Sequence, residues 1–437
     1  MEVSMKRISM LAAIVCACLT PVAWAQQRAA TPQMFKHAGP KNLTIRLKHN
    51  FRLMSPRSAG TAVTAQDNTI YDLGHYPEGS WAQLGAINDL GVATGWGDVA
   101  GGDIRVLGVP IFGPNAGQWF ETGVSTAQDQ AGEGGGITLF GMIIGYMTGD
   151  NGYPRAYAWT GNHQTTFDLG PLPGDDGSAA IAVNHLGTLI VGFSVRGLSN
   201  DPNGLTIWLS PVVWTPKFES HKSQQTLAWK IQALPMGGFE KPGKVFKNVI
   251  LNNWGGWGAN DLGQIVGDAW SDNFDEIAVI WTPTLRGGWK IERLPYKSAV
   301  ADYPYTEALA INNRGEIVGD YWECTEEACT ALPALWKVKA VGARPGPLTV
   351  LATLSGLPQG WNVAWGINDI GDVVGVSNDA DWNWLATRWK TKDPSTAMVL
   401  GFPGDWSTGF AVNNFGIAVG TYGVGDNPEQ AAAVAIH

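Results

Sequence analysis

The sequence predicts an all-β fold, a seven-bladed β-propeller built from four-stranded antiparallel blades. Three observations support this prediction. The chain is rich in glycine (56 residues) and tryptophan (21), only 15% of it is charged, and helix-like apolar spacing is hard to find. One glycine-centred phrase recurs seven times at a spacing near fifty residues, which is typical of propellers and solenoids. A strand-like segment also precedes the first phrase, where it can complete the last blade and close the ring.

The recurring phrase begins with an apolar residue and an Asn. The next position is Asp or Asn, and a variable residue and a Gly follow it. An apolar run and a second Gly complete the phrase. INDIGDVVG at 367–375 is one copy. Successive central glycines are separated by 50, 46, 76, 52, 56 and 45 residues. These glycines are Gly91, Gly141, Gly187, Gly263, Gly315, Gly371 and Gly416. Each copy is predicted to form one β-hairpin.

Each residue type in the phrase suits a tight turn. The side-chain oxygen of the Asn can accept a hydrogen bond from the backbone that follows it. The central Gly can take the positive φ that closes the hairpin, and the second Gly can admit a neighbouring backbone within the next strand. Asn312 and Gly315 are therefore interpreted as structural residues rather than as parts of a site.

Two further strands are predicted after each hairpin. The fourth is a short segment such as FDLG at 167–170 or IERLP at 291–295. The third ends on a tryptophan in five copies, at Trp159, Trp214, Trp281, Trp336 and Trp389. Because short turns join the third and fourth strands, they are predicted to pair, which gives four antiparallel strands per blade.

The seventh copy ends in AAAVAIH, at the position of a third strand, so it lacks a fourth. The segment TIYDLG at 69–74 has the character of a fourth strand and precedes the first hairpin. We therefore expect this segment to complete the seventh blade and to cover an edge that would otherwise be open. An open solenoid would need capping units, and none is recognised in the sequence.

The first 25 residues have the pattern of a secretory signal peptide. Lys6 and Arg7 precede an apolar stretch at 11–19, and Ala-Trp-Ala at 23–25 forms a cleavage site. Lipoprotein processing at Cys18 is the alternative. No later stretch is apolar enough to span a membrane as a helix. We expect a secreted or periplasmic monomer with a signal peptide (1–25), a basic flexible leader (26–68) and a propeller (69–437).

Charge divides the expected mature chain into a basic and an acidic part. The formal net charge is −9 for the whole chain and −10 without the signal peptide. Residues 26–68 hold seven Lys and Arg and one acid, or +6, so residues 69–437 carry −16. An acidic body argues against nucleic acid as a partner, because nucleic-acid binding depends on neutralising phosphates. We expect the leader to lie on its own acidic body.

Cys324 and Cys329 are the two cysteines that follow the signal peptide. In an oxidising compartment they are predicted to form a disulfide, which contributes only about 2 kcal/mol because the loop it closes is short. Neither a third Cys nor a His lies near them in sequence, so no metal site is predicted. Cofactors are not expected. The Asp-Asn-Gly loops leave calcium as an alternative to plain hairpin turns.

Two longer phrases, FDLGPLPGDDGSAAIAVNHLGTLIVG and GYMTGDNGYPRAYAW, resemble the HAF family of extracellular repeat proteins. The resemblance extends over residues 69–437. It departs from the family pattern in two places, because no third strand contains His-Ala-Phe and the second hairpin, ITLFGMIIG, lacks the Asn-Asp pair. The resemblance implies repeats of this fold and an exported location, and it implies no catalytic residues.

No common catalytic or phosphate-binding motif is found in the sequence. The loops from fourth to first strands and from second to third strands are instead expected to share one face around the central channel. Their aromatic and acidic residues are the candidate ligand-binding residues. These are Trp81, Asp175, Asp176, Trp254, Trp257, Tyr303, Tyr305, Trp361, Asp405 and Trp406.

An aromatic surface with carboxylates beside it suits sugar recognition, because the apolar face of a sugar stacks on a ring while its hydroxyls form hydrogen bonds. The favoured function is therefore binding of a glycan or another cell-surface ligand. One alternative is a polysaccharide hydrolase or lyase that uses carboxylates of the same face, held about 5–10 Å apart for hydrolysis. Another is an envelope scaffold for protein partners. For any single Trp, packing between blades is the competing interpretation.

Overall fold

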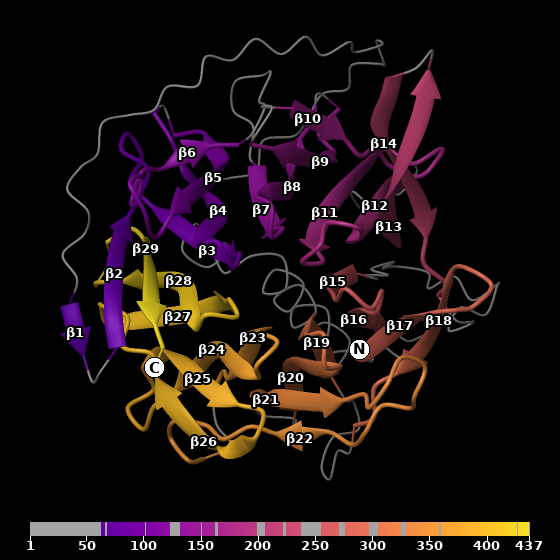
Figure 1. Cartoon of the computed structure of the whole chain (residues 1–437). Helices are drawn as coiled ribbons and strands as arrows, with labels where there is room; N and C mark the ends of the chain where they lie inside the picture. Colours follow the sequence, from indigo (N-terminus) through magenta and orange to yellow (C-terminus); the bar gives the residue numbers. More distant parts are fainter. Residues whose placement is uncertain are drawn as a thin grey trace, which may run out of the picture. The chain divides into compact units, whose positions relative to one another are not determined.

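The computed structural model describes residues 63–65, 68–100, 102–122, 132–149, 151–161, 165–198, 206–221, 224–236, 255–270, 276–296, 305–324, 329–357, 360–425 and 427–436. The signal peptide and most of the leader predicted from the sequence lie outside these residues. Within them every regular element is a β-strand, and the strands form seven antiparallel blades arranged in a ring (Figure 1). The predicted seven-bladed propeller is confirmed.

Each blade runs from an innermost first strand to an outermost fourth strand. The first three blades contain β3 (Ala82–Ile87), β4 (Val92–Asp98), β5 (Ile104–Pro110) and β6 (Phe120–Glu121); β7 (Gly132–Ile137), β8 (Met142–Thr148), β9 (Pro154–Thr160) and β10 (Thr165–Asp168); β11 (Gly177–Val183), β12 (Ile190–Leu198), β13 (Thr206–His221) and β14 (Gln224–Ala233). The first strands of neighbouring blades contact one another around the whole ring.

The next three blades contain β15 (Gly255–Ala259), β16 (Ile265–Trp270), β17 (Glu276–Pro283) and β18 (Trp289–Arg293); β19 (Tyr305–Ile311), β20 (Glu316–Cys324), β21 (Cys329–Lys337) and β22 (Thr349–Val350); β23 (Val363–Ile367), β24 (Asp372–Asn378), β25 (Trp384–Lys390) and β26 (Asp393–Val399). The seventh contains β27 (Trp406–Val412), β28 (Ile417–Gly423) and β29 (Gln430–Ala435), joined by β2 (Asn68–Gly74) and β1 (Val63–Ala65).

The glycines of the repeat have the roles that the sequence predicts. All seven central glycines have a positive φ, between 72° and 90°, so each closes its hairpin turn in the left-handed region. The second glycine lies where two strands approach closely at a β-bulge. A Cβ on Gly319, for example, would collide with the carbonyl oxygen of Glu307 on β19. Side chains larger than hydrogen are therefore excluded there.

The tryptophans at the ends of the third strands pack between blades. Trp214, Trp281, Trp336 and Trp389 are among the largest fully buried side chains. Each indole N–H donates to a carbonyl that follows the fourth strand of the preceding blade. Trp281 Nε1 lies 2.8 Å from the oxygen of Pro235, and Trp336 Nε1 lies 2.7 Å from that of Pro295. Tryptophan at this position thus fills the space between two blades and also forms a hydrogen bond across it.

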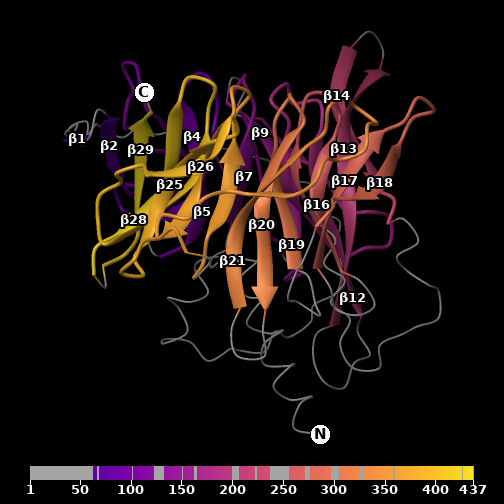
Figure 2. The ribbon, with the colours of Figure 1, turned by 90° about the horizontal axis from the view of Figure 1, so that it is seen from below.

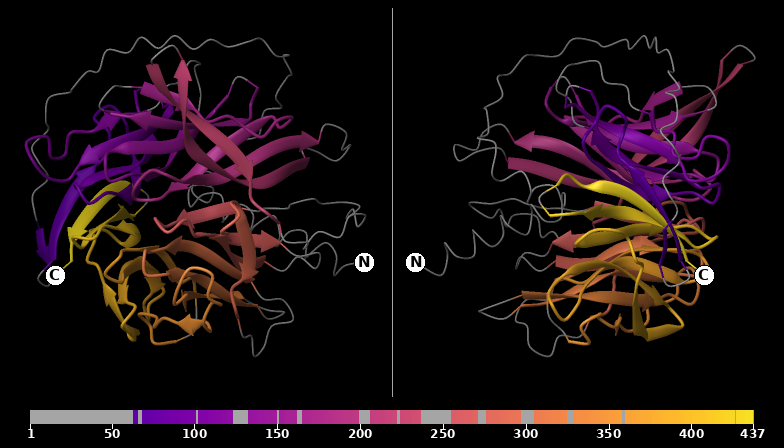
Figure 3. Two further views of the ribbon diagram at one scale, coloured as in Figure 1. Left: turned by 45° about the vertical axis from the view of Figure 1, so that its right-hand side comes forward. Right: turned by 90° about the vertical axis from the view of Figure 1, so that its left-hand side faces the viewer.

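Strands from both ends of the sequence form the seventh blade. β2 pairs antiparallel with β29, and the two lie side by side in Figure 3. Trp119 of blade one donates its indole N–H to Leu73 O at 3.0 Å, which repeats the bond that strand tryptophans make to preceding blades. Tyr422 Oη donates to Asp72 Oδ1 at 3.0 Å. β1, within the stretch predicted as leader, pairs with the outer edge of β2.

One hairpin is longer than the other pairs of third and fourth strands. β13 has 16 residues and β14 has 10, and their paired segments 215–221 and 224–230 continue beyond the point where Trp214 pairs with Ile190 of β12. This two-stranded arm extends past the rest of the ring in Figure 2. Among the described residues no helix is long and apolar enough to cross a membrane.

Candidate functional site

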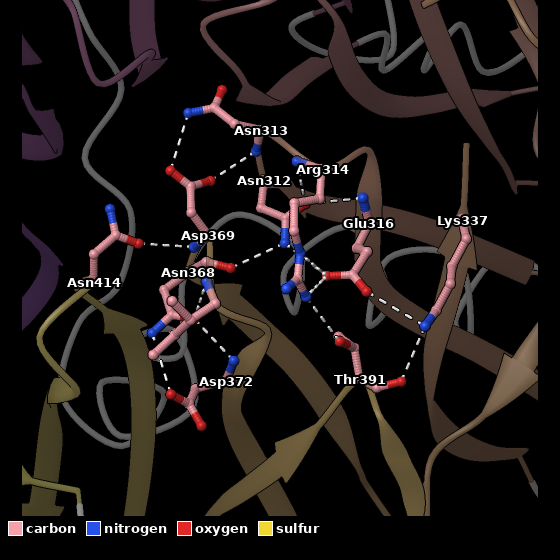
Figure 4. A network of polar contacts seen from close by, with 11 residues as sticks. Asn312, Asn313, Arg314, Glu316, Lys337, Asn368, Asp369, Asp372, Thr391 and Asn414 are labelled. Carbon is pink, nitrogen blue, oxygen red and sulfur yellow. Dashed lines mark hydrogen bonds and ion pairs between the residues drawn. The ribbon is translucent and has the colours of Figure 1, made fainter. Parts of the chain in front are cut away.

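The seven hairpin turns meet at one end of the channel, where hydrogen bonds join each blade to the next, and Figure 4 shows the bonds around Asn312 and Asn368. Asn312 Nδ2 donates to Asn368 O at 2.9 Å, and Asn368 Nδ2 donates to Asn413 O at 2.8 Å. Asn413 Nδ2 donates to Asn88 O at 3.0 Å and so links the last blade to the first. The structural role predicted for Asn312 is therefore confirmed.

The residue after each of these Asn residues points toward its neighbours around the channel. Asn313 Nδ2 lies 3.0 Å from Asp261 Oδ2 and 3.0 Å from Asp369 Oδ2, so one amide joins two carboxylates. Asn414 Nδ2 donates to Asp89 Oδ2 at 3.0 Å. Carboxylates and amides thus stabilise one another across blade boundaries. Among the described residues, no group of three His, Cys, Asp or Glu side chains is suited to hold a metal ion.

The hairpin turn of the second blade lacks the Asn-Asp pair, and Thr138 and Leu139 make the equivalent hydrogen bonds in its place. Thr138 Oγ1 accepts the backbone N–H of Met142 at 3.0 Å, as Asn does in the other turns. The carbonyl of Thr138 accepts Asn88 Nδ2 at 3.1 Å, and Leu139 N donates to His185 O at 2.9 Å. The ring of hydrogen bonds between neighbouring turns is therefore complete, although the second turn has no Asn-Asp pair.

The channel itself is small. It has a volume of about 250 Å³ and is lined mostly by the seven first strands, with glycine and alanine at many positions. Pockets for small organic ligands usually have about 300–1,000 Å³. The channel alone is thus at the lower limit for a ligand, and a larger site has to include the face at one of its ends.

The carboxylates that the sequence analysis assigned to this face are engaged in bonds to their own blades. Asp175, whose side chain is only 2% exposed, accepts hydrogen bonds from Ser194 Oγ at 2.7 Å and from Arg196 Nε at 2.8 Å. Asp176 and Asp405 each accept a backbone N–H near the end of the second strand of their blade, at 2.8 and 2.7 Å. These acids hold loops in place.

The predicted aromatic residues do not come together as one surface. Trp81 is half-buried, and its backbone N–H donates to Asp98 Oδ1 at 2.9 Å. The Trp406 indole packs against Gly423 on the paired strand. Tyr305 is half-buried at the start of β19. Trp254 and Tyr303 lie outside the described residues, as does the side chain of Trp257.

Trp361 is different, because it belongs to a cluster that extends from the surface to the channel. Its ring centroid lies 5.2 Å from that of Trp384 and 6.2 Å from that of Trp365. Trp365 contacts Phe410 at 5.7 Å, and both of these residues line the channel. We call Trp361, Trp365, Trp384 and Phe410 the aromatic cluster. Trp361 precedes the first strand of its blade, so this end of the channel is opposite the hairpin turns.

Two exposed tryptophans stand at this end of the cluster, Trp382 in the loop between β24 and β25 and Trp384 at the start of β25. Trp382 is 59% exposed and Trp384 is 44% exposed. Trp382 has a φ of 67°, the one positive value for a non-glycine residue in the described chain. Such a conformation costs about 1–2 kcal/mol for a residue with a Cβ. The loop therefore holds Trp382 in a conformation that the residue itself disfavours.

Hydrogen bonds from two side chains fix this loop. Asp379 accepts the backbone N–H groups of Asp381 and Asn383 and the side-chain amide of Asn383, each at 2.9 Å. The bond from the Asn383 side chain lowers the pKa of Asp379, so its carboxylate is ionised at neutral pH. Asn378 Nδ2 donates to Trp382 O at 3.1 Å, and its Oδ1 accepts Trp361 N at 2.6 Å.

The sequence analysis placed the loops between second and third strands on this face but did not select the tryptophans of SNDADWNW (377–384). The signal was present, since two Trp residues stand in one polar loop. Their nearness to Trp361, on a separate segment, required the fold. The disulfide stays a prediction. β20 and β21 pair Cys324 with Cys329 directly, but the side chains of both lie outside the described residues.

Comparison with known proteins finds only distant structural similarity. No model of a protein family and no curated protein matches this chain. A puromycin hydrolase S511A mutant complexed with PGG is 12% identical with a TM-score of 0.48, over 79% of this chain and 50% of that one. Trypanosoma rangeli sialidase is 12% identical with a TM-score of 0.41, over 85% and 60%. The chain spans about half to three fifths of these proteins, and the HAF assignment stays a prediction.

Proposed function

We propose that the protein binds glycans through Trp361, Trp382 and Trp384, on the face opposite the hairpin turns. The observation that carries this proposal is the exposed Trp382 at a φ of 67° on a loop fixed by hydrogen bonds. Backbone strain of this kind persists only where the surrounding structure imposes it, and it is commonly found at functional sites. A large exposed side chain kept at such a position is typical of binding rather than of packing.

The chemistry around the two exposed indoles favours a sugar. An indole presents a flat apolar surface on which the C–H groups of a pyranose ring can stack. Asp381 and Asn383 are exposed in the same loop and offer carboxylate and amide groups for hydroxyls. The fixed loop also reduces the entropy that binding would otherwise cost. Mixed apolar and polar contacts of this kind are what a neutral or weakly charged glycan requires.

Binding without cleavage is the better supported form of this proposal. Glycoside hydrolysis by the usual mechanism needs two carboxyl groups that face the scissile bond. The acids first considered for that role, Asp175, Asp176 and Asp405, accept hydrogen bonds from their own blades. No pair among them is therefore free for substrate.

Residues 26–437 should bind a defined set of glycans on an array without releasing reducing sugar. Titration calorimetry with the best glycan should then show a loss of about 1–3 kcal/mol for Trp384→Ala, because an exposed stacking surface is removed. The matched control is Trp289→Ala, which removes a half-buried indole of another blade that donates to Gly263 O. It should lower the melting temperature and leave the affinity unchanged.

Two results would count against the proposal. If no glycan on the array is bound, glycans are not the ligand. If Trp384→Ala binds the glycan with wild-type affinity, the binding site does not include Trp384 and lies elsewhere. Release of reducing sugar would instead support the hydrolase alternative.

A further inference from the structure

The hairpin turns carry an apolar surface at the other end of the channel. In six of the seven turns the residue just before the central glycine is large, apolar and between 49% and 74% exposed. Turn tips in water are usually polar. We call these six residues the apolar crown. They are Leu90, Phe140, Leu186, Leu262, Ile370 and Phe415.

The crown residues belong to one surface because their turns are bonded to one another. The Asn and Asp residues that precede them link the turns into a closed ring, which sets all seven tips at the same end of the channel. Arg314 has the equivalent position in blade five. Its guanidinium donates to Glu316 and to Thr391 of the next blade. The crown is thus interrupted at one position.

The area of the crown is that of a protein interface. A Phe side chain buries about 150–250 Å², and Leu or Ile buries less, so at their observed exposures the six crown residues together present on the order of 600 Å² of apolar surface. The largest apolar patch on a typical monomer has about 300–600 Å². A standard interface buries about 800 Å² per partner. The summed area of the crown lies at the upper end of the first range and below the second value.

The arm of blade three supplies a second, independent observation. Its segments 215–221 and 224–230 pair with each other beyond the end of β12, on the side of the ring where the hairpin turns lie. A two-stranded hairpin without further support is only marginally stable in water. An arm at the outer edge of this end can gain that support by lying along the rim of a molecule seated on the crown.

We propose that two copies of the chain pair face to face through their apolar crowns. A two-fold contact needs a surface that is complementary to itself, and a ring of apolar tips at one end of the channel can pair with its own copy. Asp89, Asp261 and Asp369 lie inside the crown among amide partners, so two such recesses form a water-filled chamber in which the carboxylates stay hydrated. The net charge of −16 on residues 69–437 disfavours an anionic membrane as the occupant, and its repulsion of a second copy is screened at physiological salt, where the Debye length is about 8 Å.

Sedimentation velocity of residues 26–437, over a wide range of concentration, tests this pairing. The wild type should sediment as a dimer that dissociates on dilution. Phe140→Asp and Phe415→Asp should be monomers at all concentrations, because each places a charge in the apolar contact. Both should fold as the wild type does and lose only the part of the melting temperature that dimerisation itself supplies, since these side chains are 72% and 74% exposed in the single chain. Val424→Asp is the matched control at the opposite face and should remain a dimer.

Neutral variants control for a local effect of the new carboxylate, which at position 415 would lie next to Asn414 and its partner Asp89. Phe140→Ser and Phe415→Ser should weaken the dimer at least tenfold. A wild type that is monomeric throughout would overturn the proposal, and so would crown variants that dimerise like Val424→Asp. A monomer that binds vesicles of phosphatidylcholine would show that lipid is the occupant and would also overturn it.

Discussion

Replacement of Trp281 or Trp336 by Ala is expected to lower the free energy of unfolding by about 3–5 kcal/mol, the usual cost of truncating a fully buried aromatic side chain. Both side chains have 0% exposure. Each also satisfies a carbonyl of the preceding blade, which the substitution leaves without its donor. Urea denaturation of residues 26–437, followed by tryptophan fluorescence and circular dichroism, measures the change.

Trp384→Ala is the comparison for this prediction. It removes the same side chain from a position that is 44% exposed, so it loses mainly the contact with Trp361, about 0.5–1.5 kcal/mol. Equal destabilisation by the exposed and the buried substitution would show that the strand tryptophans do not hold the blades together.

Removal of β2 is expected to have the second large effect. Deletion of residues 26–66 removes β1, an edge strand that pairs only with β2 in the described chain, and should lower the melting temperature little. Deletion of residues 26–74 also removes β2. It exposes the edge of β29, takes Ile70 out of the core and leaves the Trp119 indole without its acceptor, Leu73 O. We expect aggregation or loss of a cooperative transition.

Thermal melting with simultaneous light scattering compares the two truncations. The shorter one is the control, because it lacks the same leader but keeps the closing strand. If both melt alike, the pairing of β2 with β29 contributes little to stability, and contacts between the turns of the first and last blades would have to hold the ring.

The fold was predictable because its signals are local. A positive φ at Gly315 and an Asn that accepts the backbone after it need only a few residues of context, and seven copies of one phrase repeat the prediction. The partners of the phrase were not predictable. Asn312 also bonds to Asn368 O in the next blade, and no pattern within one copy indicates that contact.

The site was harder to predict because its residues have two roles that look alike in sequence. Asp175 and Asp405 stand in loops, where a carboxylate can bind a ligand or a backbone N–H, and the structure shows protein bonds at both. Trp406 packs within its blade, whereas Trp361 joins a cluster. The crown was not predicted because each tip residue, such as Phe415, has no distinguishing feature in the sequence. Only the closed ring brings the six tip residues to the same end of the channel.

Trp382→Gly tests glycan binding at the aromatic face most directly, because binding and stability should change in opposite directions. Glycine accepts a φ of 67° without strain, so the melting temperature should stay the same or rise as about 1–2 kcal/mol of strain is relieved. The affinity for the best array glycan, measured by calorimetry, should fall at least about tenfold, or 1.4 kcal/mol, because a stacking surface is lost. Unchanged affinity together with a lowered melting temperature would contradict the account and would place the Trp382 indole among the residues that hold the fold.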